Sequence, residues 1–116
     1  MITAHDLAQT LRVRSAKRHA QAEVRVAGMR ERFPEAKRIL VERYHADRVV
    51  LFGSLATGRY SERSDVDLAV EGMPSASYFR ALADLMTLFG GPVDLVRVEE
   101  AAPSLRAHID EEGRPL

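Results

Sequence analysis

The sequence of 116 residues has no cysteine, which excludes disulfide bonds, thiolate zinc sites and cysteine nucleophiles and suits a reducing cytoplasm. It lacks any apolar run approaching the ~18 residues of a membrane-spanning helix, so we expect nothing that crosses a membrane. The first six residues hold an early acid and no apolar segment, so we expect no secretory signal there. These absences predict a cytoplasmic protein, and the length fits one domain.

The sequence also lacks net charge, with 17 Lys+Arg against 17 Asp+Glu. A neutral chain has no general attraction for nucleic acid, so we do not expect indiscriminate duplex binding. The balance hides an asymmetry, because residues 1–48 hold 11 basic and 6 acidic side chains and residues 49–116 hold 6 and 11. A basic front half is therefore joined to an acidic back half, and the acids need an explanation.

Residues 5–32 contain no proline and one glycine, and their composition predicts a long N-terminal helix. Its expected apolar stripe is narrow and weak: Leu7, Leu11, Ala16, Ala20, Val24 and Ala27. A helix of ~28 residues would be ~42 Å long, more than a core this small can cover. We therefore expect part of it to pack on a second copy or on a partner. His19 and Glu23, four residues apart, are expected to form a solvated pair.

The remaining sequence alternates between helical and strand patterns. Helices are expected over residues 34–46, 77–89 and 104–112, and strands over 48–53, 65–70 and 93–98. The expected buried faces are Ala36, Ile39, Leu40 and Tyr44 in the first of these helices and Phe79, Leu82, Met86 and Phe89 in the second. Ser104 is expected to cap the last helix and Gly113 to end it. The fold class is α/β (α+β), a small mixed β-sheet of about three to four strands flanked by helices.

Three aspartates lie in predicted strands, where aspartate is depleted. Asp65 and Asp67 are two residues apart, so both side chains are expected on one face, and Asp94 interrupts another aliphatic strand. If the strands are neighbours, three carboxylates converge and repel each other unless a cation neutralises them. Oxygen ligands of this kind select Mg²⁺ or Mn²⁺, and such a site can hold two ions ~3.5–4 Å apart. The alternative is that the Asp65 and Asp67 pair only faces solvent on an edge strand.

Gly53 and Ser54 lie at the end of the first predicted strand, where a turn or a helix is expected to begin. Backbone N–H groups and a serine hydroxyl there can hold phosphate, and the glycine lets it approach closely. This is not a Walker A loop, because Arg59 and Tyr60 stand where Lys and Ser or Thr are required.

Gly53-Ser54, ten residues and then Asp65-Val66-Asp67 resemble the signature of the DNA polymerase β-like nucleotidyltransferase superfamily, most closely its minimal members in bacteria and archaea. The resemblance covers about residues 36–113 and implies a nucleotidyltransferase fold. It implies a nucleotidyltransferase domain over residues 34–116, preceded by a helical extension over residues 1–33.

The resemblance implies roles residue by residue. Gly53 and Ser54 would bind the triphosphate of ATP, and Asp65 and Asp67 would ligate the Mg²⁺ ions that bridge it. Asp94 would complete the metal site and help to activate a hydroxyl that attacks the α-phosphorus, leaving pyrophosphate.

The sequence departs from the family at Thr57, where many members have arginine. Arg59 or Arg63 could supply the missing positive charge for nucleotide binding, although their spacing differs. The alternative is a weak or degenerate enzyme.

Many short members of the family resemble antitoxins that transfer AMP to a tyrosine of a HEPN-domain ribonuclease toxin, or that simply hold the toxin in a complex. We therefore expect a protein adenylyltransferase whose partner is a HEPN-type toxin. A second hypothesis is a binding module that neutralises its partner by occlusion through the N-terminal helix. A third is nucleotidyl transfer to a small molecule or to an RNA end.

Overall fold

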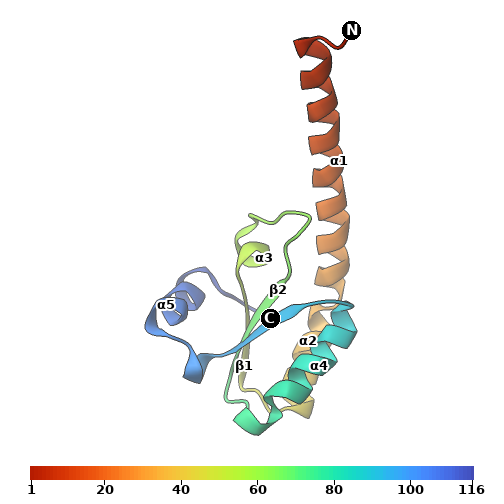
Figure 1. Cartoon of the computed structure of the whole chain (residues 1–116). Helices are drawn as coiled ribbons and strands as arrows, with labels where there is room; N and C mark the ends of the chain where they lie inside the picture. The colour runs from red at the N-terminus through yellow and green to blue at the C-terminus, as the bar shows by residue number, and fades with distance from the viewer.

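The computed structural model describes residues 1–116 as a four-stranded sheet covered by helices, from which one long helix projects (Figure 1). The elements in chain order are α1 (Ala4–Glu31), α2 (Phe33–Arg38), the π-helical turn η1 (Ile39–Arg43), β1 (Arg48–Phe52), α3 (Ser54–Thr57), β2 (Val66–Glu71), the 3-10 turn η2 (Ser75–Ser77), α4 (Tyr78–Phe89), β3 (Val93–Arg97), the 3-10 turn η3 (Val98–Glu100), α5 (Pro103–Glu112) and β4 (Arg114–Pro115).

The strand order of the sheet is β3-β2-β1-β4, and the sheet is mixed, as predicted. Strand β1 pairs antiparallel with β2, so that Phe52 lies opposite Asp67. Strand β3 pairs parallel with β2 after the α4 crossover, and Asp67 lies opposite Asp94. The fourth strand, β4, pairs antiparallel with β1 over two residues, too short a run for a sequence pattern to reveal.

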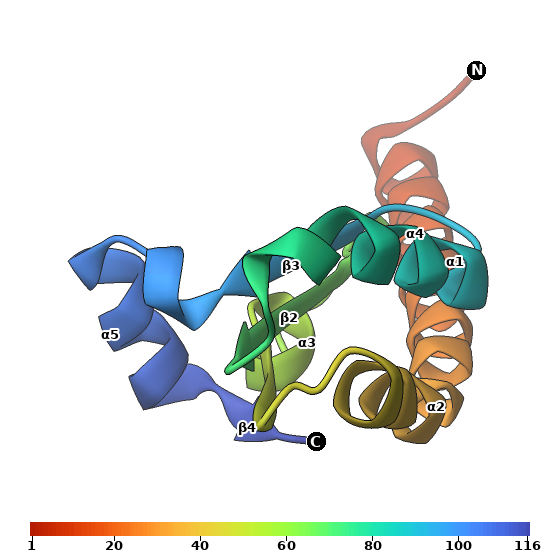
Figure 2. The same cartoon turned by 90° about the horizontal axis from the view of Figure 1, so that it is seen from below.

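Alternation along β2 gives the sheet two different faces. Val66, Leu68 and Val70 are fully buried and belong to the main core, which α2, η1, α4 and the end of α1 cover. Ala69 turns to the opposite face and joins a smaller cluster with Ile109 of α5. Helix α5 lies on this second face (Figure 2). Asp67 has the same parity as Ala69, so the candidate site lies on the α5 side of the sheet.

Helix α1 begins with a capping box between Thr3 and Asp6 and projects well beyond the rest of the molecule (Figure 1). The radius of gyration, 17.6 Å, exceeds the ~13 Å of a compact domain of about 100 residues. The expected long N-terminal helix is confirmed. His19 and Glu23 also pair as expected, 3.1 Å apart and exposed.

The predicted apolar stripe of α1 is wrong, because all six of its residues are exposed and none contributes to the core. The buried residues are Ala22, Val26 and Met29, in the last three turns. Their spacing continues into the buried Phe33 and Ala36 of α2, so the register of α2 on the core decides which face of α1 is covered. The weak apolar pattern of α1 could not reveal this.

The face expected for the helix over residues 77–89 is also partly wrong. Helix α4 buries Ala81 and Leu85 completely, whereas Phe79 is 80% exposed and Met86 is 43% exposed. The small Ala81 allows the helix to approach the sheet, and the Tyr78 hydroxyl donates to the Leu95 carbonyl at 2.7 Å. These contacts rotate Phe79 into solvent.

Two further expectations about helix ends and faces have different outcomes. Ala36, Ile39, Leu40 and Tyr44 are all buried as predicted, although the helix changes to a π-helical turn at residue 39. Ser104 does not cap α5: the N-cap is Ala102, Pro103 takes the first turn, and no side chain caps the helix.

No helix combines the length and apolar character needed to cross a membrane.

Candidate active site

Two aspartates lie opposite each other on adjacent strands of the sheet. Because β2 and β3 are parallel neighbours, Asp67 and Asp94 are direct register partners, and strands of a sheet lie ~4.8 Å apart. Asp67 is half-buried and Asp94 is exposed. Both point to the sheet face that α5 covers only in part, so the pair is open to solvent on the Asp94 side.

The electrostatics of the pair are unfavourable without a cation. Burial, followed by the negative charges of Asp94 and Asp65, raises the pKa of Asp67 to about 6. No basic side chain is among the groups that shift this pKa. A positive ion or a hydrogen-bond donor beside such a carboxylate would stabilise its charged form.

The glycine–serine corner lies directly against Asp67. Gly53 follows β1 with a φ of +72°, and a Cβ built there would overlap the Asp67 carboxylate and lie 3.0 Å from its Cγ. Gly53 is the N-cap residue of α3, and no side chain caps this helix. The carbonyl of Gly53 accepts from the N–H groups of Ala56 and Thr57, so its backbone shapes the turn. Glycine is required here both by backbone geometry and by the close approach of the carboxylate.

Asp65 precedes β2 and is held by a residue that the sequence motifs do not single out for this site. The Arg25 guanidinium of α1 lies 3.0 Å from the Asp65 carboxylate. The same guanidinium donates to the carbonyls of Glu62, at 3.1 Å, and Ser64. The only sequence signal for Arg25 is that it is one of the 11 basic residues among residues 1–48, and basic residues on a helix are typical of a solvated face.

The expected nucleotide-binding side chains lie on α3 and the loop after it. The Thr57 hydroxyl donates to the Ser54 carbonyl at 3.3 Å and so closes the short helix. Thr57 brings no positive charge to the acids. Arg59 and Arg63 are exposed, and neither forms an ion pair. Their proposed contact with a nucleotide stays a prediction. Arg30 of α1 reaches α3 instead and donates to the Leu55 carbonyl at 3.1 Å.

The donor set suits a hard divalent cation, because Asp65, Asp67 and Asp94 supply only carboxylate oxygens. As the side chains are placed, no three acids or histidines are close enough together to hold an ion. Asp65 faces Arg25, whereas Asp67 and Asp94 face each other across the strands. The three-acid metal site therefore stays a prediction, with two of its members side by side and the raised pKa of Asp67 as the feature that favours a cation.

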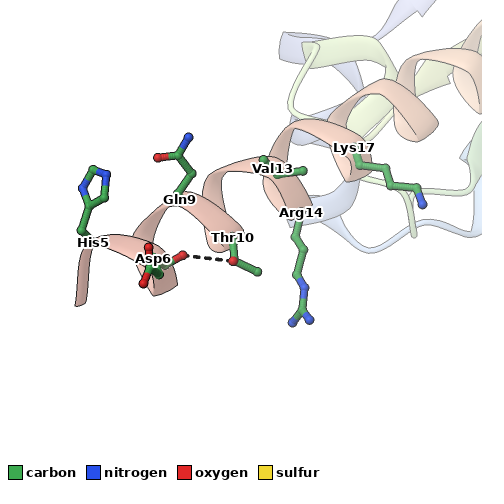
Figure 3. Close-up of a pocket in the computed structure, with 7 residues that line it drawn as sticks. All are labelled: His5, Asp6, Gln9, Thr10, Val13, Arg14 and Lys17. Carbon is green, nitrogen blue, oxygen red and sulfur yellow. Dashed lines mark hydrogen bonds between the residues drawn. The ribbon is translucent and has the colours of Figure 1, made fainter. Parts of the chain in front are cut away.

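A surface hollow lies elsewhere, along the projecting part of α1 (Figure 3). All seven lining residues come from this one helix, between His5 and Lys17, and no second element closes the space. Only one of them, Val13, is apolar. A ligand there would remain exposed, so this hollow does not compete with the acid pair as an active site.

Comparisons with known proteins agree with the fold. The family described as polymerase beta, nucleotidyltransferase matches residues 35–116. A candidate protein adenylyltransferase of Methanocaldococcus jannaschii is 34% identical over 82 residues, 66% of this chain and 82% of that protein. A solved candidate minimal nucleotidyltransferase has 35% identity and a TM-score of 0.67, and covers 78% of this chain and 95% of that one. A chain of a mutated toxin–antitoxin complex, MntA–HpeT, shares the fold with 23% identity, a TM-score of 0.62, and 72% and 69% coverage.

Proposed function

The chain belongs to the polymerase beta nucleotidyltransferase family, and we propose that it transfers the adenylyl group of ATP to a hydroxyl group of a partner protein. The observation that carries this proposal is the Asp67–Asp94 pair packed against the Gly53 corner, where no basic side chain lowers the pKa of Asp67 and where we propose that the phosphates bind. The relative at 34% identity, described as a candidate protein adenylyltransferase, supports the choice of a protein acceptor.

In this proposal the Gly53 and Ser54 backbone would bind the triphosphate, and Asp65, Asp67 and Asp94 would hold Mg²⁺. The ion, when bound, would neutralise charge on the phosphates and on the three carboxylates. Thr57, Arg59 and Arg63, on α3 and the loop after it, are further nucleotide-binding candidates. Asp94, exposed at the edge of the pair, accepts the proton of the incoming hydroxyl. The hydroxyl oxygen then bonds to the α-phosphorus, the bond to the β-phosphate oxygen breaks, and pyrophosphate leaves.

The acceptor we propose is a tyrosine of a HEPN-type toxin, with this chain as the antitoxin. The resemblance of the signature to antitoxin-type members supports the choice, and chains of toxin–antitoxin complexes share the fold. A tyrosine hydroxyl suits the exposed Asp94 side of the site, which a protein surface can reach without entering a deep cavity.

A second candidate function is neutralisation of the partner by binding alone. The projecting part of α1 favours it, because six of the nine large exposed apolar residues lie in the first 24 residues: Met1, Ile2, Leu7, Leu11, Val13 and Val24. In this case α1 contacts the partner and blocks its active surface, and the acid pair is not needed.

The test incubates the purified protein with labelled ATP, Mg²⁺ and the product of the neighbouring gene. We expect label on the partner, lost by at least about 100-fold in Asp67→Asn and in Asp94→Asn, because each removes a carboxylate from the reacting site. Asp110→Asn is the matched control. Asp110 is 70% exposed on α5, and its ion pair with Arg48 is long, at 3.9 Å.

Transfer that survives Asp67→Asn would contradict the site assignment. If Asp67→Asn transfers no label but neutralises the partner's activity as effectively as the wild-type protein, the function is binding alone.

A further inference from the structure

One arginine of α1 gathers three acceptors from a four-residue stretch of the chain next to the candidate site. The Arg25 guanidinium binds the Asp65 carboxylate with one nitrogen and the carbonyls of Glu62 and Ser64 with the other. The partners lie 37 to 40 residues away in sequence. A planar guanidinium is suited to several acceptors at fixed angles, whereas a lysine ammonium on a flexible stem is not.

The stretch that Arg25 binds has few other attachments. Its remaining hydrogen bonds are internal: the Ser61 N–H donates to the Ser64 hydroxyl at 2.8 Å, the Ser64 N–H donates to the Ser61 carbonyl at 3.1 Å, and the Arg63 N–H donates to the Ser61 hydroxyl at 3.2 Å. These bonds shape the turn but do not fix it to the body of the protein. Arg25 is therefore the side chain that ties residues 62–65 to another element.

We propose that Arg25 is a positioning residue of the active site, which holds Asp65 and residues 62–65 in the arrangement that receives the metal–nucleotide complex. This inference rests on the proposed function and adds α1 to the catalytic unit. Arg25 sits in the part of α1 that the main core anchors, between the buried Ala22 and Val26. The helix therefore gives its guanidinium a rigid base.

The geometry favours positioning over blocking. Arg25 takes only the Oδ1 atom of Asp65, so the Oδ2 atom stays available to a ligand. Two of its three bonds go to backbone carbonyls, which a residue that merely competed for the carboxylate would not need. The pair is also partly open, with Arg25 38% and Asp65 43% exposed, so an arriving ion need not displace a deeply buried ion pair.

The experiment compares Arg25→Gln and Arg25→Lys with Arg14→Gln in the full-length protein. Arg14→Gln removes the same charge from an exposed position of the same helix and is the matched control. Hydrogen exchange of the Arg63 and Ser64 amides is measured without metal or nucleotide, and Mn²⁺ binding is measured by electron paramagnetic resonance. Label transfer to the partner is measured last.

We expect faster exchange at residues 63 and 64 and about tenfold weaker Mn²⁺ binding in Arg25→Gln, the scale on which residues that orient metal ligands act. Arg25→Lys should restore little, because an ammonium cannot reach all three acceptors. Arg14→Gln should match the wild-type protein in both measurements.

The proposal would be overturned if Arg25→Gln had the same exchange rates and Mn²⁺ affinity as Arg14→Gln. Tighter Mn²⁺ binding in Arg25→Gln would also overturn it, because Arg25 would then be a competitor of the ion. The exchange measurement does not depend on catalysis. Absence of label transfer by the wild-type protein would therefore count against the proposed function, while the exchange result would still decide whether Arg25 holds the loop.

Discussion

At the scale of single residues, Gly53 joins the backbone corner to the acid pair. Its φ of +72° with a ψ of −156° is a conformation that side chains strongly disfavour, and a Cβ there would overlap the Asp67 carboxylate. Gly58, at the other end of α3, also has a positive φ, +81°, but a Cβ added to it would meet no atom within 4 Å. A side chain at either glycine would therefore strain the backbone, but only a side chain at Gly53 would also meet the Asp67 carboxylate.

We predict that Gly53→Ala abolishes nucleotide binding and lowers the free energy of unfolding by about 2–3 kcal/mol, because it combines strain with displacement of Asp67. Gly58→Ala should cost about 1 kcal/mol and keep nucleotide binding, since only the left-handed backbone is affected. Urea denaturation and nucleotide titration below the melting temperature measure both effects. Equal loss of binding in the two variants would show that strain alone, not the Asp67 contact, is responsible.

The raised pKa of Asp67, about 6 against an ordinary value of 3.8, makes stability depend on pH. The folded protein binds the Asp67 proton more tightly than the unfolded chain does, so stability falls as pH rises from about 4 through 6 and stays lower above that. A shift of this size corresponds to at most about 3 kcal/mol. Because Asp67 is only half-buried, solvent screening reduces this to on the order of 1 kcal/mol.

We therefore predict that Asp67→Asn, which cannot ionise, is more stable than the wild-type protein by about 1 kcal/mol at pH 8 in a chelator, and that the difference vanishes at pH 4. Denaturant unfolding at the two pH values measures it. Wild-type protein as stable as the variant at pH 8, or a difference that persists at pH 4, would show that the Asp67 charge carries no such cost.

Residue spacing was enough to predict Gly53, Ser54, Asp67 and Asp94 as site candidates, because strand periodicity and the turn place them without knowledge of the rest of the fold. Arg25 could not be found in this way. Its contact with Asp65 joins positions 40 residues apart, and in the sequence it is one of several basic residues on a helix. Only the packing of Ala22 and Val26 on the core turns it toward the loop.

At the scale of elements, α1 has two parts with different environments. The large apolar residues of its first turns are exposed, whereas Val26 and Met29 are members of the main core. The expected division into a helical extension over residues 1–33 and a domain over residues 34–116 stays a prediction, and the burial of Val26 and Met29 shows where a deletion must stop.

We predict that deleting residues 2–18 leaves the free energy of unfolding of the monomer within about 1 kcal/mol of the wild-type value, because these residues bury no core side chain. Deleting residues 2–32 should instead unfold the protein, since it removes Val26 and Met29 and the Arg25 contact. Circular dichroism during heating distinguishes the two deletions. A stable fold after the longer deletion would mean that the end of α1 contributes little to the core.

The sequence predicted most elements of the fold but not all of their faces. The strands were clear because runs such as residues 48–52 are short, apolar and bounded by turn signals. The faces of α1 and α4 were misjudged because a helix with exposed apolar residues has more than one plausible stripe. Phe79 shows the difficulty: the larger residue is exposed, and the small Ala81 is buried where the helix meets the sheet.

At the scale of the whole molecule, the elongated shape leaves apolar surface without a partner. The molecule extends 63 Å along its longest axis and 29 Å and 20 Å along the others, and the projecting part of α1 accounts for this shape (Figure 1). Four large apolar residues of α1 are more than half exposed: Leu7, Leu11, Val13 and Val24. An isolated helix of this composition is marginally stable in water.

We predict that this part of α1 packs on a second copy or on the partner protein and is protected by that association. Sedimentation of the full-length protein and of the chain without residues 2–18, each with and without the partner, measures the assembly. The full-length protein should form the larger species and the truncated one should not. A monomer whose residues 5–18 are protected from hydrogen exchange would contradict this prediction.

The most direct test of the central claim, that Asp67 and Asp94 beside Gly53 form a site for a divalent ion and a nucleoside triphosphate, is calorimetric titration with a non-hydrolysable ATP analogue. With Mg²⁺ present, the wild-type protein and Asp110→Asn should bind equally well. Binding should weaken by at least about tenfold in Asp67→Asn or when Mg²⁺ is removed, because the acids then no longer share an ion with the phosphates. Binding of equal strength in Asp67→Asn and Asp110→Asn, or no binding by the wild-type protein, would contradict the account.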